Sequence, residues 1–415
     1  MAVWNNYNSD PLCWREQDVV YISALNKARC VSDFIRAVDS GIRRENIKDF
    51  LIDFNNINDA LFPNAVAPIS GIIEYYKNKG IAFEYDNISK SIQSTKILTP
   101  TKYNPTEYIK VLGKVWYFYS SDDAYELVQA FIVELQKSAQ FYKGVLNTIE
   151  WSLYEVLDNV IQHSKIGYGC VMGQLHQRNS NIAFSIFDAG QGIYNSFRGT
   201  IYKPKTNVDA ITLSIQEEIT RDKSIGQGNG LFGLHSIVKQ GRGKLVITSS
   251  GGSYIYNDGN VRQYNFLPVI SKETPGTIID FQLNYSKDMS LDKALVFRGK
   301  QYHLINVHFE ELEDEKGFIH YKIKDRAEGT GTRDSAIRVK NEIHNILTEE
   351  QKPIILDFEG VAVISSSFAD ELLAKLFLEF GLFQFNNLIK IKGLDTSQQN
   401  VLHRSVLQRI AEEIK

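Results

Sequence analysis

The stretch Tyr154-Glu-Val-Leu-Asp-Asn-Val-Ile-Gln-His-Ser164 (YEVLDNVIQHS) decides how this chain is interpreted, because it combines a helical pattern with a row of polar residues. Its apolar residues follow the spacing of an amphipathic helix. Glu155, Asn159 and His163 are four residues apart, so they lie on one helix face, one turn above the other. Apolar neighbours share that face, which is therefore expected to point inward. Polar groups there need partners, and a ligand could supply them.

The composition is that of a soluble globular protein, with 43% hydrophobic and 23% charged residues. The 415 residues suffice for two or three domains. The net charge of −3 gives no general attraction to nucleic acid or to an anionic membrane. The three cysteines (Cys13, Cys30 and Cys170) are too widely spaced to suggest a disulfide framework or a zinc site, and they fit a reducing cytosol.

No targeting or membrane segment is expected. The start MAVWNNYNSDPLC lacks the basic residues and apolar core of a secretory signal. No run of about 18 or more apolar residues occurs, so no membrane span is predicted. The expectation is a cytoplasmic protein of several domains.

The two ends of the chain have related patterns. Residues 31–86 alternate helix, strand, helix and strand, which predicts a largely parallel sheet. Residues 292–415 alternate in the same way and finish in a helix. KDFLIDFNNINDALFPNAVAPISGII aligns with KPIILDFEGVAVISSSFADELLAKLF, so that Asp53-Phe54 falls on Asp357-Phe358. We interpret the two blocks as a diverged internal repeat; the alternative is that any βα unit has this appearance.

The central part is predicted to contain both helices and strands. Residues 125–164 predict two helices with a break near residues 140–146. GCVMGQLHQ and NIAFSIFDAG predict strands, residues 199–230 a mobile loop, and LFGLHSIVKQG a helix ending at Gly241. KLVITSSGG, SYIYNDGN, VRQYNF and GTIIDFQL are then expected to form an antiparallel meander.

Four elements with nucleotide-binding chemistry occur in order in this central part. They are Glu155 with Asn159, Asp188 with Gly190 and Gly192, the run Gly226-Gln-Gly228-Asn-Gly230-Leu-Phe-Gly233, and Gly276-Thr277. A carboxylate at a strand end can accept a hydrogen bond from an exocyclic amine, and neighbouring glycines let the backbone approach a base. A glycine run that opens a helix offers N–H groups to phosphates. An asparagine oxygen suits Mg²⁺, and a nearby glutamate can take a proton.

Each element alone has an ordinary explanation, as a turn, a solvated helix face or a flexible loop. The glycine run is not a Walker A loop, and no Rossmann fingerprint is present. The order and context of the four elements favour a common site.

Residues about 115–285 resemble the GHKL ATPase family, which includes gyrase, heat-shock chaperone, histidine kinase and mismatch-repair ATPases. YEVLDNVIQHS resembles the N box, FDAGQGI the G1 box, GQGNGLFGL the G2 box with its ATP lid, and GTIIDF the G3 box. The resemblance implies ATP and Mg²⁺ as ligands and a Bergerat α/β sandwich as the fold. No phosphohistidine box is apparent.

The resemblance also implies roles for individual residues. Asn159 would hold Mg²⁺, Asp188 would hold the adenine, and Glu155 would be the general base. The glycines would line the base pocket (Gly190, Gly192) and wrap the phosphates (Gly226, Gly228, Gly230), and Thr277 would reach the adenine through water. His163 is interpreted as structural. Lys205, Arg221 and Lys223 of the lid at residues 193–230 would either approach the triphosphate or be solvated.

The closest subgroup looks like the anti-sigma-factor serine kinases, because residues about 292–415 resemble the STAS-like fold of their antagonists. In that family a phosphorylatable serine follows a strand and opens a helix. By register, Ser367 is at that position, with Ser366 beside it. The sequence has Ser365 where the family has Asp and Phe368 where it has Gly. The alternative is that the serines only cap the helix. The N-terminal copy has Leu61-Phe62-Pro63 there and no acceptor.

The predicted architecture is a multidomain α+β and α/β protein. Residues 1–112 would be an N-terminal STAS-like αβ domain, residues 113–287 the GHKL ATP-binding domain, and residues 288–415 a C-terminal STAS-like domain. The predicted function is a regulatory ATPase switch that controls the flanking domains and a protein partner. The alternatives are a serine kinase acting on a STAS-domain serine in cis or in trans, and a scaffold that holds nucleotide without hydrolysis. A homodimer is plausible by resemblance.

Overall fold

The computed structural model describes residues 10–413 apart from residues 56, 58–59, 108, 218, 220–229, 266–275, 298–299 and 302–311. The chain forms two compact units. The first comprises Met1–Phe131, Thr148–Ser286 and Leu291–Tyr302, and the second comprises Ile132–Asn147, Lys287–Ser290 and His303–Lys415. The predicted boundary at residue 112 falls within the first unit.

The N-terminal part of the first unit is a small, largely parallel sheet with helices. Its elements are β1 (Cys13–Glu16), β2 (Val19–Ile22), α1 (Arg29–Glu45), β3 (Asp49–Asp53), α2 (Pro63–Lys77), β4 (Ala82–Asp86) and α3 (Lys90–Ser94). The strand order is β1-β2-β3-β4, with β2, β3 and β4 parallel. The predicted helix–strand–helix–strand order is confirmed. The β1–β2 hairpin was missed because four-residue strands carry too little periodicity.

The larger sheet of the first unit has the order β11-β10-β9-β12-β8-β7-β6-β5. Its strands are β5 (Thr101–Lys102), β6 (Val115–Phe118), β7 (Gly169–His176), β8 (Asn181–Asp188), β9 (Lys244–Ser249), β10 (Gly252–Asn257), β11 (Asn260–Tyr264) and β12 (Thr277–Asn284). The helices are α4 (Ser121–Ser138), α5 (Val145–His163), α6 (Gly192–Ser196), α7 (Asn207–Ser214) and α8 (Gly230–Gln240), and Gln177–Asn179 form a 3₁₀ turn. The two long predicted helices, the break between them and the helix at LFGLHSIVKQG are confirmed.

Two expectations for this region were wrong. The last predicted strand, β12, does not continue the meander, since it pairs with β8 and β9 in the middle of the sheet. Alternation identifies a strand but not its partner, and β12 is buried along most of its length, as a central strand must be. The loop predicted at residues 199–230 contains α7, which opens with a capping box between Thr206 and Asp209.

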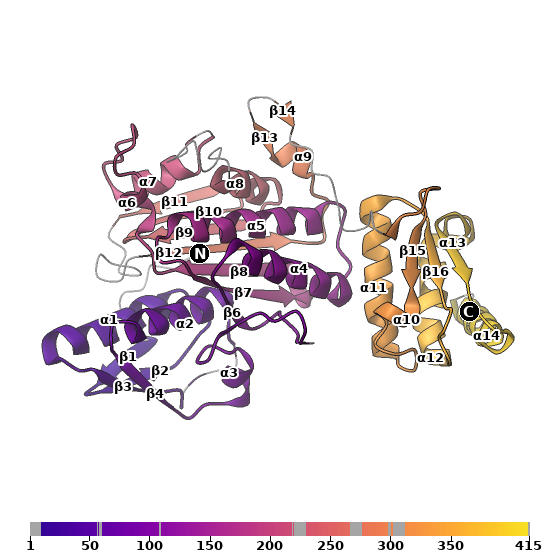
Figure 1. The fold of residues 1–415 in the computed structure, drawn as a ribbon, viewed down its shortest axis with the longest axis horizontal. Coiled ribbons are helices and arrows are strands. Elements are labelled where there is room, and N and C mark those ends of the chain that lie inside the picture. The colour runs from indigo at the N-terminus through magenta and orange to yellow at the C-terminus, as the bar shows by residue number, and fades with distance from the viewer. Residues whose placement is uncertain are drawn as a thin grey trace. The chain divides into compact units, whose positions relative to one another are not determined.

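Both faces of the larger sheet are covered. On one face, Phe184 stacks on Phe281 and meets the edge of Phe131 from α4. On the other face, Phe187 packs against α2, where a side chain added at Gly71 would overlap the Phe187 ring. Figure 1 shows α1 and α2 between the small sheet and the large one. The N-terminal αβ block and the large sheet therefore share one hydrophobic core.

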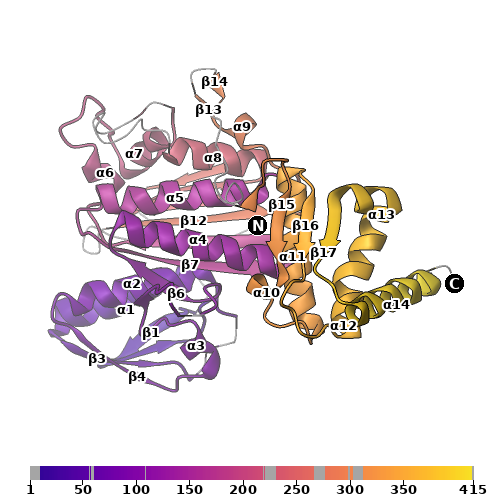
Figure 2. The ribbon, with the colours of Figure 1, turned by 45° about the vertical axis from the view of Figure 1, so that its right-hand side comes forward.

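The second unit contains another parallel sheet, with the order β15-β16-β17. Its elements are β15 (Ile319–Lys322), α10 (Ile323–Arg326), α11 (Arg333–Glu350), β16 (Ile354–Asp357), α12 (Ser366–Ala369), a π-helical turn (Asp370–Ala374), α13 (Lys375–Leu388), β17 (Ile389–Lys392) and α14 (Thr396–Glu413). Figure 2 shows α13 and α14 on the β17 side of this sheet. The predicted alternation of helices and strands is confirmed. The strand β15, which precedes it, was not predicted.

The remaining elements are α9 (Leu291–Ala294), β13 (Val296–Phe297) and β14 (Lys300–Gln301), all in the first unit. Mixed α/β structure in several sheets agrees with the predicted fold class. Within the described ranges, no helix has the length and apolar character needed to cross a membrane.

Candidate functional site

Glu155 and Asn159 meet the first residue of another helix. A Cβ atom added at Gly230, where α8 begins, would lie 2.5 Å from Glu155 Oε2 and 2.9 Å from Asn159 Nδ2. A side chain at residue 230 would therefore have to displace the polar ends of Glu155 and Asn159. The N-terminus of α8, which is the positive end of the helix dipole, therefore lies directly on the polar row of α5.

The surroundings of Glu155 and Asn159 indicate which atom can bind a cation and which group can exchange a proton. Asn159 Nδ2 donates to the carbonyl oxygen of Glu155 at 2.6 Å, so the side-chain oxygen of Asn159 is the atom that would bind a cation. Burial, and then the nearby carboxylate of Asp158, raise the pKa of Glu155 to about 7. A carboxyl group with a pKa near neutral is suited to accepting and releasing a proton.

Asp188 ends strand β8 and begins a tight loop. The buried carboxylate accepts a hydrogen bond from the N–H of Gly190 through Oδ1 at 2.8 Å, which fixes its orientation. A side chain at Gly190 would overlap the carbonyl oxygen of Ser164. Gly192 has a φ of +74°, and a side chain there would overlap the Ser250 hydroxyl. The geometry of this loop therefore explains both glycines that the sequence singled out.

Thr277 lies beside Asp188 at the start of β12. It pairs with Asp188 on one side and with Ser249 of β9 on the other. The Ser249 hydroxyl lies 3.3 Å from Thr277 Oγ1, donates to the carbonyl oxygen of Gly276 at 2.9 Å, and accepts from the N–H of Ile193 at 2.9 Å. Sequence reasoning missed Ser249, because a serine at a strand end carries no motif of its own.

The end of α5 is bonded to the Asp188 loop. The Gln191 side chain donates to the carbonyl oxygen of His163 at 2.9 Å, and the Gln191 N–H donates to the carbonyl oxygen of Ser164 at 3.1 Å. The helix that carries Glu155 and Asn159 is thus joined to the loop that carries Asp188. Gln191 was also missed, because a glutamine between two glycines carries no motif of its own. These hydrogen bonds use the backbone of His163 and give its side chain no catalytic role.

The other predicted residues of the glycine run and the lid cannot be added to this arrangement from the described residues. Gly226, Gly228, Arg221 and Lys223 lie outside the described residues. Lys205 is exposed next to the N-cap of α7. Among the described residues, no group of three or more His, Cys, Asp or Glu could hold a metal ion by itself.

The serine cluster lies in the second unit. Ser365 is the N-cap of α12, and its hydroxyl accepts from the N–H of Phe368 at 3.0 Å. The hydroxyl of Ser367 lies 3.0 Å from that of Ser365, while Ser366 is exposed on the first turn. The capping interpretation is confirmed for Ser365. Among the described residues, the side chains of Ser366 and Ser367 make no capping hydrogen bond to the backbone of α12.

One comparison with known proteins finds a related domain. Residues 335–399 match the model of a family described as a STAS-like domain of unknown function (DUF4325). The match runs from the first turn of α11 to the first turn of α14 and confirms that the C-terminal part is STAS-like. A search of curated proteins gives no match.

Proposed function

We propose that the first unit binds ATP with Mg²⁺ and that the nucleotide regulates the contacts of the flanking αβ blocks with a partner protein. The observation that carries the proposal is the contact of Gly230 with both Glu155 and Asn159. It brings a metal-ligating oxygen, a carboxyl group with a pKa near 7 and a helix N-terminus together, although the residues are far apart in sequence. These are the groups that a nucleoside triphosphate and its cation require.

The surrounding fold supports the same proposal. An antiparallel sheet with α4 and α5 on one face agrees with the Bergerat sandwich that the resemblance implies. Asp188 and Thr277, on adjacent strands, would form the adenine side of the site. Mg²⁺, when bound, would neutralise charge on the phosphate oxygens. Glu155 would take a proton from the attacking hydroxyl group, and Asn159 would hold the cation through its side-chain oxygen.

Nucleotide binding can be tested at Asp188. Asp188→Asn removes the charge but keeps the shape, and a charge-assisted hydrogen bond is worth about 1.5–3 kcal/mol. Titration with a fluorescent ATP analogue should show a loss of affinity of about 10- to 150-fold. Asp258→Asn in the β10–β11 turn is the matched control, because Asp258 has a positive φ of 44° that asparagine tolerates. Unchanged affinity of Asp188→Asn for the ATP analogue would show that Asp188 does not bind the nucleotide.

The alternative of a serine kinase is favoured by the exposure of Ser366. Incubation with ATP labelled on the γ-phosphate separates the candidate functions. Hydrolysis releases labelled phosphate, whereas a kinase labels protein. A kinase acting on this chain should add phosphate to the peptide of residues 352–375, and Ser366→Ala or Ser367→Ala should remove it. ATP binding without either product would indicate a scaffold.

A further inference from the structure

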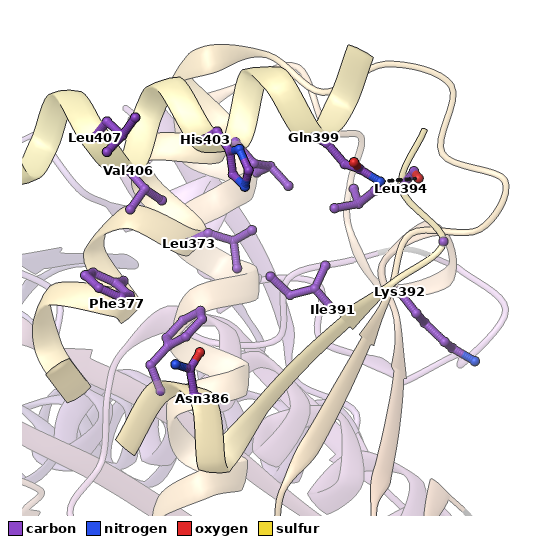
Figure 3. Close-up of a pocket in the computed structure, with 13 residues that line it drawn as sticks. Leu373, Phe377, Asn386, Ile391, Lys392, Leu394, Gln399, His403, Val406 and Leu407 are labelled. Atoms are coloured by element: carbon purple, nitrogen blue, oxygen red, sulfur yellow. Dashed lines mark hydrogen bonds between the residues drawn. The ribbon is translucent and has the colours of Figure 1, made fainter. Parts of the chain in front are cut away.

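The second unit contains a cavity of about 730 Å³ between α13, β17 and α14 (Figure 3). Its walls are largely apolar, and its lining residues do not indicate what would fill it. The hydroxyl group of Ser249 in the first unit is different, because its hydrogen bonds define the chemistry of a ligand. Ser249 is 1% exposed and is the last residue of β9.

Ser249, Thr277 and Asp188 lie side by side on three neighbouring strands. Thr277 of β12 pairs with Ser249 of β9 on one side and with Asp188 of β8 on the other. Directly paired residues of a sheet point to the same face, and alternate residues along a strand share that face. The face is the one on which Phe184 stacks on Phe281. A ligand group that reaches Asp188 on this face therefore also comes close to Thr277.

The hydrogen bonds of Ser249 fix the direction of the Thr277 hydroxyl group. A serine hydroxyl has one proton, and Ser249 donates it to the carbonyl oxygen of Gly276 at 2.9 Å. The contact of 3.3 Å between the hydroxyl oxygens of Ser249 and Thr277 must then have Thr277 as its donor. Since this contact uses the single hydroxyl proton of Thr277, the Thr277 oxygen can only accept a hydrogen bond from a ligand.

Ser249 also holds the loop that carries Asp188. The Ser249 oxygen accepts from the N–H of Ile193 at 2.9 Å. Within the same loop, Asp188 Oδ1 accepts from the N–H of Gly190 at 2.8 Å, and a carboxylate only accepts hydrogen bonds. One buried hydroxyl group thus positions two hydrogen-bond acceptors, Asp188 and Thr277, on adjacent strands.

We propose that Ser249 is a positioning residue through which the nucleotide site selects a purine with an amino group at C6 and rejects a purine with a carbonyl group there. The 6-amino group of adenine has N–H donors for both Asp188 and Thr277, directly or through a water. A 6-carbonyl oxygen only accepts, so it would leave both buried acceptors without a donor. This inference rests on the proposed nucleotide-binding function and names the groups that choose the base.

The test compares ATP with inosine triphosphate, which has a carbonyl oxygen in place of the 6-amino group. Both nucleotides, with Mg²⁺, compete against a fluorescent ATP analogue bound to the full chain. The wild-type chain should prefer ATP by at least about tenfold. Ser249→Ala lets the Thr277 hydroxyl donate to the carbonyl oxygen, so the preference should fall to about threefold or less. Because both affinities are measured on one sample, any loss of folded protein cancels in their ratio.

Two variants separate positioning from packing. Ser249→Thr keeps the hydroxyl group and should keep the wild-type preference for ATP. Thr248→Ala is the matched control, because Thr248 is buried, points to the opposite face and hydrogen-bonds to the Ser253 hydroxyl at 3.1 Å. It should lower stability but leave the preference unchanged.

The outcomes distinguish this inference from the proposed function. Equal binding of both nucleotides by the wild-type chain would overturn the inference and leave nucleotide binding intact. An unchanged preference in Ser249→Ala, or an equal fall in Thr248→Ala, would do the same. Failure of the wild-type chain to bind either nucleotide would overturn the proposed function together with the inference.

Discussion

The N-terminal and C-terminal αβ blocks make the same turn after the central strand. Asp53 and Asp357 each accept a hydrogen bond from the N–H two residues later, at 2.8 and 3.0 Å. Phe54 and Phe358 follow, each 1% exposed. The N–H of Phe54 donates to the carbonyl oxygen of Asp86, and the N–H of Phe358 donates to that of Lys392. In each block the acceptor is the last residue of the neighbouring strand. This shared geometry gives the proposed repeat a structural basis.

The blocks differ in the helix that follows the turn. In the N-terminal block, α2 is buried along most of its length because it packs on the large sheet, and it has no side-chain cap. In the C-terminal block, the helix has a serine cap, a buried ion-pair network and an exposed apolar end. The N-terminal copy has thus become part of a core, while the C-terminal copy exposes polar and apolar groups on its surface.

The largest expected effect is at the buried ion-pair network. Glu371 is 3% exposed in its side chain and pairs with Arg333, Lys340 and Lys375. Glu371→Ala would leave the largely buried Lys340 without its carboxylate, whereas the more exposed Arg333 and Lys375 stay hydrated, so the cost should be about 1.5–3 kcal/mol in unfolding free energy of the second unit. Hydrogen exchange in peptides from α11 and α14 would report it.

A matched variant separates the network from a surface charge. Lys375→Ala removes only a 37% exposed partner and should cost no more than about 1 kcal/mol. Equal losses for the two variants would show that Glu371 is not the centre of the network.

The next effect is in α2. Gly71→Ala forces a methyl group into the Phe187 ring and should destabilise the first unit by about 1–3 kcal/mol. Urea unfolding followed by tryptophan fluorescence would measure it. Gly331→Ala is the control, because a methyl group there meets nothing within 4 Å. A neutral Gly71→Ala would mean that α2 does not pack tightly on the sheet.

Two half-buried glutamates, one in each unit, allow the chemistry of the two units to be compared. Burial, as the leading cause, raises the pKa of Glu155 and of Glu349 to about 7 from an ordinary value of 4.5. The folded state holds the proton of each glutamate more tightly than the unfolded state does. The protonated carboxyl group therefore makes its full contribution to the free energy of unfolding below about pH 4.5, and this contribution is lost as the pH rises through 7. Either Glu→Gln change should therefore raise stability at pH 8, by on the order of 2 kcal/mol.

Only Glu155 is proposed to act in turnover. If it is the general base, the rate should rise as the pH passes through 7, because the carboxylate accepts the proton. Glu155→Gln should abolish turnover but keep nucleotide binding. Glu349→Gln should keep both, since Glu349 accepts from the N–H of Gly144 in the second unit. Full activity in Glu155→Gln would exclude it as the base.

The smallest effect is at the serine cap. Ser365→Ala removes the hydrogen bond to Phe368 N and should cost about 1 kcal/mol, whereas Ser366→Ala should change stability by less than about 0.5 kcal/mol. Thermal unfolding of both variants gives the comparison. A larger loss of stability in Ser366→Ala than in Ser365→Ala would show that Ser366, and not Ser365, caps the helix.

Periodicity and special residues were enough to predict α5, α8, strands β7 and β8, and the αβ alternation at both ends. They also identified Glu155, Asn159, Asp188 and the glycines near them. In the structure Glu155 and Asn159 meet at Gly230, and Asp188 lies beside Thr277. ATP binding and catalysis by these residues stay predictions.

The sequence by itself determined the local elements and the places where only glycine fits, because helix and strand periods and backbone strain act over a few residues. Only the tertiary structure decided that β12 lies between β8 and β9, that α2 shares a core with the large sheet, and that Ser249 and Gln191 connect the site. Strand partners and packing partners are chosen by contacts between residues far apart in the chain, and no local pattern records them.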